Sequence, residues 1–218
     1  MKHWFTLLSL LLLMPLAHAG FDEGIEYREL ASPQPVDGKG IEVRELFWYG
    51  CPHCYHLESE LDKWLEKKPA DVDFVRMPAV LGPSWELLGR AYYAAQMLGV
   101  LDRIHQPLFD RLHKDKKPIR TVDELRAFFV EQGVPAEDFD KTYGSFAVIT
   151  RTNRGKQVRE LYGVSGVPTL IVNGKYVVTA RMAGGNDKML EVVDYLVAKE
   201  RKAAAKDAVP AAAKQAAQ

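Results

Sequence analysis

Two cysteines separated by two residues give this chain a centre suited to redox chemistry. Cys51 and Cys54 are the only cysteines, and Pro52 and His53 lie between them. Two thiols at this spacing can close a small disulfide and reopen it by exchange with another thiol. The enclosed loop is too short to constrain much unfolded chain, so a purely structural crosslink is disfavoured. The pair is predicted to be reactive.

The surroundings of the pair favour the anionic form of Cys51. An apolar run, residues 46–49, precedes the motif, and helical spacing begins at Cys51. A thiol at a helix start faces free N–H groups and the positive end of the helix dipole. Pro52 suits the first helical turn, and His53 can add a positive charge or an N–H donor. We expect Cys51 to be the accessible sulfur at the exposed helix start and Cys54, one turn later, to face inward.

A zinc site and an inert disulfide are the alternative interpretations of the pair. Zinc would require two further ligands; His56 is one candidate, but the chain has no second cysteine pair. We therefore expect no metal and no cofactor other than the redox-active disulfide Cys51–Cys54. His56, His105 and His113 are expected at the surface.

Glu45 interrupts an otherwise apolar strand face that it shares with Val43 and Phe47. Two interpretations stay open. The carboxylate either lies in water near the sheet edge, or is a buried acid near the cysteines that biases their ionisation.

The first residues predict export. Lys2 and His3 precede an apolar run, residues 4–16, and Ala17-His18-Ala19 offers small residues where a signal peptidase inspects the chain. The run is shorter than the roughly 20 residues that a membrane span needs. We expect residues 1–19 to be a cleaved signal peptide and the mature protein to be soluble in an oxidising compartment.

The composition gives no sign of a polyanionic partner. Lys plus Arg and Asp plus Glu number 29 each, so neither nucleic acid nor an anionic surface is indicated. The Ala/Lys-rich end, residues 201–218, has no apolar stripe and predicts a frayed helix that runs into a disordered tail.

The elements around the motif predict a parallel βαβ unit. A short strand is possible at 27–30, and residues 41–49 alternate as a strand that becomes apolar on both faces. A helix follows from Cys51 and stops before Pro69, and residues 72–77 form the next strand.

A helical block comes next. Helices are predicted at 85–98, at 102–113, after the capping box that begins at Thr121, and at 135–146. No strand pattern interrupts this stretch. We assign residues 83–146 to an all-helical insertion domain.

The α/β pattern then returns. A helix at 145–162, a strand at 167–172, the turn Asn173-Gly174, a strand at 176–179 and a helix at 186–199 follow in order. Residues 20–82 and 147–200 are therefore the two parts of one α/β domain that the insertion interrupts.

The motifs together resemble a known family. A C-x-x-C between strand and helix, with a later Val-Pro-Thr at the start of a hairpin strand, resembles the thioredoxin superfamily. Residues 47–54, the helical insertion, and Gly166-Val167-Pro168-Thr169 with Val172-Asn173-Gly174 are together similar to the DsbA family of periplasmic thiol oxidases of Gram-negative bacteria. The resemblance covers nearly all of residues 21–200 and implies a thioredoxin-like fold interrupted by a helical domain.

The resemblance also implies roles for particular residues. Val167-Pro168 would be a cis peptide bond beside Cys51, and Val167, Pro168 and Thr169 would hold an extended substrate chain through backbone hydrogen bonds. Glu45 and Glu58 match acidic residues near the redox centre and would tune it together with Pro52 and His53. Some family members carry a second disulfide in the helical domain, which this chain lacks.

The resemblance implies a periplasmic monomer that donates its disulfide to reduced, unfolded exported proteins. A quinone-linked membrane protein similar to DsbB would reoxidise it. An isomerase or reductase on the same fold is the nearest rival, although the family isomerases carry a separate N-terminal dimerisation domain. A peptide-binding chaperone or a metal carrier is a third possibility.

Overall fold

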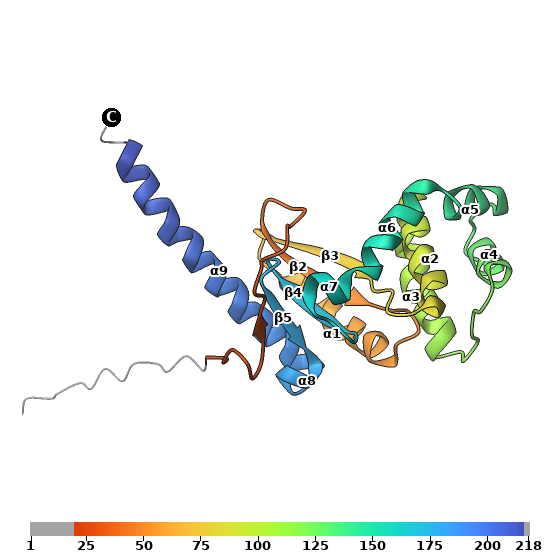
Figure 1. The fold of residues 1–218 in the computed structure, drawn as a ribbon. Coiled ribbons are helices and arrows are strands. Elements are labelled where there is room, and N and C mark those ends of the chain that lie inside the picture. The colour runs from red at the N-terminus through yellow and green to blue at the C-terminus, as the bar shows by residue number, and fades with distance from the viewer. Residues whose placement is uncertain (1–19, 216–218) are drawn as a thin grey trace, which may run out of the picture.

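A mixed five-stranded sheet forms the centre of the molecule (Figure 1). The structure is a computed structural model that describes residues 20–215, and it describes side chains as far as Lys206. The expected signal peptide, residues 1–19, and residues 216–218 lie outside the described residues. The strand order is β1-β5-β4-β2-β3, and only the β2–β3 pair is parallel. The strands are β1 (Arg28–Glu29), β2 (Ile41–Phe47), β3 (Val72–Pro78), β4 (Thr169–Val172) and β5 (Tyr176–Thr179).

The predicted βαβ unit is confirmed. Helix α1 (Pro52–Lys67) connects β2 to β3 and begins directly after Cys51. The hairpin is confirmed as well, although Val172 pairs with Tyr176, so that Lys175 also lies in the connection. Asn173 and Gly174 have φ angles of 50° and 63°. These are the left-handed values that the two central residues of such a turn require.

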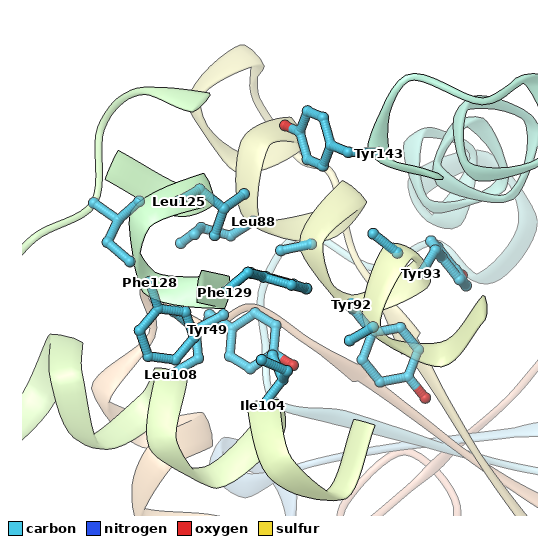
Figure 2. Packing of buried hydrophobic residues seen from close by; sticks show 14 of the residues in the cluster. Tyr49, Leu88, Tyr92, Tyr93, Ile104, Leu108, Leu125, Phe128, Phe129 and Tyr143 are labelled. Carbon is cyan, nitrogen blue, oxygen red and sulfur yellow. The ribbon is translucent and has the colours of Figure 1, made fainter. Parts of the chain in front are cut away.

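Helices replace strands between β3 and β4. They are η1 (Pro83–Trp85), α2 (Glu86–Met97), α3 (Leu101–His113), α4 (Val122–Glu131), α5 (Ala136–Tyr143), α6 (Phe146–Lys156) and α7 (Val158–Tyr162). The capping box is present, since the Thr121 hydroxyl accepts from the Glu124 N–H and the Glu124 carboxylate accepts from the Thr121 N–H. Figure 2 shows the aromatic core of this block, in which Tyr49 from the end of β2 lies among residues of α3 and α4.

Three apolar clusters hold the layers together. Helices α1 and α9 (Asn186–Gln215) cover one sheet face, and α7 covers part of the other. The third cluster joins the helical block to the cysteine motif, and its members include Phe47, Tyr49, Cys51, Cys54, Ile104, Leu108 and Phe109. The redox motif therefore lies where the helical block meets the sheet.

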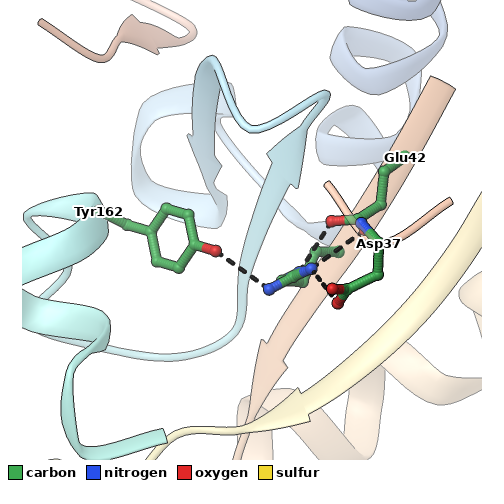
Figure 3. Close-up of polar contacts among 4 residues, drawn as sticks. Asp37, Glu42 and Tyr162 are labelled. Atoms are coloured by element: carbon green, nitrogen blue, oxygen red, sulfur yellow. Dashed lines mark hydrogen bonds and ion pairs between the residues drawn. The ribbon is translucent and has the colours of Figure 1, made fainter. Parts of the chain in front are cut away.

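On the α7 side of β2, buried charges replace apolar contacts (Figure 3). Arg44 Nε donates to Glu42 Oε1 at 2.8 Å, Nη2 donates to Asp37 at 2.8 Å, and Nη1 donates to the Tyr162 hydroxyl at 3.1 Å. Arg44 and Glu42 are both nearly fully buried. Each charge is paired, as burial of a charge requires.

Several elements differ from the sequence prediction. The helix expected at 145–162 is broken at Gln157 into α6 and α7, and the short helix α8 (Ala180–Ala183) was not predicted. Helix α9 continues to Gln215, so residues 201–215 are helical where we expected a frayed helix and a disordered tail. Alanine and lysine are strong helix formers, which favours a helix without an apolar stripe, but propensity does not account for its continuation through Pro210.

Candidate active site

The cysteine motif forms the corner between β2 and α1. Cys51 is the N-cap of α1, Pro52 is its first residue, and the Cys51 N–H donates to the Trp48 carbonyl at 2.9 Å. A Cβ at Gly50 would lie 2.4 Å from the Trp48 ring, so only glycine fits this corner. Both cysteines are free thiols here.

Cys51 is less exposed than the motif suggested, with 9% of its surface accessible. The expectation of an exposed sulfur is wrong in this respect because the loop before β4 covers it. Cys51 Sγ contacts the Val167 carbonyl oxygen at 3.4 Å. The predicted cis peptide bond, Val167-Pro168, is confirmed and lies in the same loop. Thr169 is fully buried, and its hydroxyl donates to the Gly166 carbonyl at 2.9 Å.

The Cys51 thiol is acidified by its surroundings. The Cys54 thiol, which donates to the Cys51 sulfur, is the main cause that lowers the pKa of Cys51 to about 6, against the effect of burial. Backbone N–H groups of Cys54 and His53 add to it, and the His53 side chain contributes a smaller Coulombic part. From the sequence, we named the helix terminus and His53 as sources of acidification; the partner thiol contributes more than the backbone N–H groups or the His53 charge.

Cys54 has the opposite character. It is fully buried, and burial is the main cause that raises its pKa well above the usual value, with further contributions from Cys51 and Glu45. The site therefore favours the thiolate at Cys51 and the protonated thiol at Cys54.

A cavity of about 730 Å³ opens beside the motif. His53 and the loop from Gly163 to Thr169 form one side, and the segment from Thr179 to Gly185 forms the other. Arg28 and Arg181 also line it. The cavity is next to the backbone groups that the resemblance assigned to substrate binding.

The acids predicted near the pair are buried together beneath α1. Glu45 is fully buried and Glu58 nearly so, which decides between the two interpretations of Glu45. Arg76 of β3 binds both: Nε donates to Glu45 Oε2 at 3.0 Å and Nη2 donates to Glu58 Oε2 at 2.9 Å. Burial raises the pKa of both acids, and the Glu58 charge raises that of Glu45 further.

Two members of this cluster were missed from the sequence. Arg76 lies directly opposite Glu45 in the β2–β3 register, so a basic residue within an otherwise strand-like run was the available signal. The prediction that His105 lies at the surface is wrong, because it is 8% exposed and faces Glu58. Its spacing to Leu108, Phe109 and Leu112 places it on the apolar face of α3, which could have identified it.

Comparisons with known proteins agree with this geometry. Residues 42–197 match the family model described as DSBA-like thioredoxin domain. The chain is 45% identical over 187 residues to the thiol:disulfide interchange protein DsbA of Pseudomonas aeruginosa, covering 85% of this chain and 89% of the relative. It is 41% identical over 189 residues to DsbA of Azotobacter vinelandii, covering 86% and 88%.

Solved structures extend the likeness to three dimensions. The crystal structure of Pseudomonas aeruginosa DsbA aligns with a TM-score of 0.80 at 44% identity, covering 84% of this chain and 96% of that one. The oxidoreductase DsbA from Xylella fastidiosa gives a TM-score of 0.75 at 37% identity, with coverage of 81% and 96%.

The fold and the paired cysteines define a thiol:disulfide oxidoreductase of the thioredoxin type, as the sequence predicted. Within that class, the chain belongs to the DSBA-like thioredoxin domain family.

Two further findings concern the described part of the chain. Among residues 20–215, no helix combines the length and apolar character needed to cross a membrane. Within the same range, no three His, Cys, Asp or Glu side chains are grouped as metal ligands.

Proposed function

We propose that this protein is a disulfide donor: its Cys51–Cys54 disulfide passes to reduced exported proteins as they fold. The observation that carries the proposal is the acidified thiol of Cys51, buried against the cis-proline loop beside an open cavity. A stabilised thiolate favours the reduced protein, which makes the disulfide form an oxidant. DsbA is itself the established example of this relation between an acidic thiol and an oxidising disulfide, so the trend is a known property of the family.

The exchange has two balanced steps. A substrate thiolate attacks Cys51 Sγ, a mixed disulfide forms, and Cys54 leaves with the electron pair of the broken bond. The second thiolate of the substrate then attacks the substrate sulfur that is bonded to Cys51 in the mixed disulfide. The substrate disulfide forms, and Cys51 leaves as a thiolate. The substrate loses two electrons and the protein becomes the dithiol.

The substrate is proposed to lie along the loop before β4. Backbone groups of Val167 and Thr169 would bind an extended chain by strand-like hydrogen bonds, with Pro168 shaping the loop. The cavity beside His53 would receive side chains that flank the substrate cysteine. Pro52, His53, Glu45 and Glu58 are proposed to tune the two thiols.

The remaining predictions belong to the same proposal. The protein would reach the periplasm through a cleaved signal peptide, residues 1–19, and act as a monomer without metal or organic cofactor. A quinone-linked membrane protein similar to DsbB would reoxidise it. Residues 20–82 and 147–200 would form the thioredoxin-like domain, with 83–146 as the helical insertion.

Oxidation of a reduced peptide with two cysteines tests the donor direction. Stoichiometric oxidised protein is expected to convert the peptide to its disulfide within minutes at pH 7, because the acidified Cys51 is a good leaving group. Mass spectrometry of the acid-quenched peptide measures the conversion. A protein that only reshuffles scrambled disulfides, and leaves the reduced peptide unchanged, would be an isomerase or a reductase instead.

Replacement of His53 tests the proposed tuning. His53→Ala is expected to raise the pKa of Cys51 by about one unit and to make the equilibrium with glutathione about tenfold less oxidising. The Coulombic part of the acidification is lost, while the backbone N–H of residue 53 and the Cys54 thiol remain. Equilibration in glutathione buffers measures the change, with His56→Ala as the matched exposed control. An unchanged constant would remove His53 from the tuning residues.

A further inference from the structure

The buried acids beneath the cysteines differ in the polar groups that lie near them. Arg76 donates to both Glu45 and Glu58. Glu58 Oε2 also lies 3.3 Å from His105 Nε2, a contact that does not have hydrogen-bond geometry. Within the described part of the chain, the Oε1 atoms of both acids have no hydrogen-bond partner. Two carboxylates share one guanidinium, so a single bound proton makes this buried group neutral.

The tautomer of His105 follows from its two neighbours. Its Nδ1 lies 2.8 Å from the Tyr49 hydroxyl, and burial raises the pKa of that hydroxyl well above its usual value, so the oxygen keeps its proton. A lone pair on Nε2 would face the Glu58 carboxylate and repel it. That repulsion is absent when the Tyr49 hydroxyl donates to Nδ1 and the proton of His105 is on Nε2.

His105 stays neutral in this position. Burial, and then the Arg76 charge, lower the pKa of His105 to about 3. Its ring is enclosed by aromatic rings from β2 and its continuation, α2 and α3, with centroid distances of 5.3 Å to Tyr49 and 5.3 Å to Phe109. A rigid, neutral N–H donor therefore faces Glu58 from the helical insertion.

Solvent reaches the two acids unequally. A cleft of about 300 Å³ between α1 and α3 is lined by Glu58, Ser59, Asp62 and Gln106. Glu45 does not line it and is fully buried. Glu58 lines this cleft and is 3.3 Å from His105 Nε2, so we expect a negative charge to cost less at Glu58 than at Glu45.

We propose that His105 is a positioning residue of the redox centre: it keeps Glu58 ionised and leaves the single proton of the acid pair on Glu45, the acid near Cys54. A neutral Glu45 places no negative charge beside Cys54 when that sulfur leaves as a thiolate. The acid that contributes to the raised pKa of Cys54 is Glu45, not Glu58. The effect of Glu45 on the departure of Cys54 depends on the proposed function, but the location of the proton on Glu45 does not.

The titratable and charged groups around the acid pair come from every packed element. They are Glu45 of β2, Tyr49 after it, Cys54, Glu58 and Asp62 of α1, Arg76 of β3, Tyr92 of α2 and His105 of α3. Tyr92 keeps its proton because burial raises its pKa. The acids are therefore the groups in this set that exchange a proton near neutrality.

Carbon NMR of the reduced protein with ¹³C-labelled glutamate carboxyls tests the inference. Signals are assigned with Glu45→Gln and Glu58→Gln, and each carboxyl is followed from pH 5 to pH 8. In the unchanged protein, the Glu45 carboxyl is expected to show the shift of a protonated acid and to titrate last. In His105→Phe, which keeps the aromatic packing, Glu58 is expected to take the larger share of the proton.

Matched variants separate positioning from simple packing. His105→Gln can accept from Tyr49 and donate toward Glu58, and is expected to restore the original proton location. His113→Phe alters a histidine on the same helix whose Nε2 contacts the Tyr49 carbonyl at 2.7 Å, and is expected to change nothing. If His105→Phe does not fold, Tyr49→Phe removes the hydroxyl that fixes the tautomer and is expected to move the proton partly to Glu58.

An acid pair whose proton stays on Glu45 in both His105→Phe and Tyr49→Phe would overturn the inference. So would a proton found on Glu58 in the unchanged protein. Either result could be obtained while the pKa of Cys51 stays at about 6, and the proposed function would then stand without this role for His105.

Discussion

Cys51→Ser is expected to reduce disulfide transfer to a reduced two-cysteine peptide by at least about a thousandfold. The hydroxyl cannot take part in thiol–disulfide exchange, and Cys54 is fully buried with a raised pKa, so it cannot replace Cys51. The initial rate of peptide oxidation measures the loss. The unchanged protein is preoxidised, and Cys51→Ser, which cannot form the internal disulfide, is first charged with a mixed disulfide.

Cys54→Ser is the matched control because it keeps the attacking sulfur of Cys51 and removes the resolving sulfur. When Cys51 of this variant is first charged with glutathione as a mixed disulfide, a substrate thiolate is expected to displace glutathione as its thiolate, and the mixed disulfide between Cys51 and substrate is expected to accumulate, visible as a mass adduct under non-reducing conditions. Substantial oxidation by Cys51→Ser, or stoichiometric metal binding that accompanies full activity, would point instead to a carrier or a chaperone.

The stability of the reduced protein is expected to rise with pH more steeply than that of Cys51→Ser. The pKa of Cys51 is lowered by folding from an ordinary 9.0 to about 6. A lowered folded-state pKa contributes stability that is fully present above the unfolded value and is lost as pH falls through the folded value. The full contribution is about 4 kcal/mol above pH 9, at about 1.4 kcal/mol per unit.

Denaturant unfolding of the reduced protein at pH 5, 7 and 9 measures this contribution. The difference in unfolding free energy between the protein and Cys51→Ser is expected to grow by about 4 kcal/mol over that range and by about 1.4 kcal/mol between pH 5 and pH 7. Parallel pH profiles for the two proteins would show that the folded state does not favour the thiolate.

The fold could be predicted well from sequence because its signals are local. Strand alternation over 41–49 predicted β2, which ends two residues earlier at Phe47, helical spacing from Cys51 predicted α1, and Asn173-Gly174 predicted the hairpin. The break at Gln157 carries no proline, and the available signal was Gly155, two residues before it, because glycine is a poor helix former. The length of α9 depended on helix propensity alone, which is a weak indicator next to an apolar stripe.

The candidate site was only partly predictable because its electrostatics depend on groups distant in sequence. The cysteines, Pro168 and the acids followed from motifs and family resemblance. The strength of the Cys54 contribution to Cys51, the cover provided by Val167, and the contact of His105 with Glu58 require three-dimensional proximity. A histidine on an apolar helix face, His105, is the one signal that should have been given more weight.

The pH titration of thiolate absorbance in the reduced protein tests the central claim most directly. Absorbance near 240 nm, corrected with Cys51→Ser, follows the Cys51 thiolate as it forms. We predict a midpoint at about pH 6. A midpoint at the roughly 8.5 of a free cysteine would contradict the account. The folded site would then not stabilise the Cys51 thiolate, and transfer of the disulfide to a substrate would not be favoured.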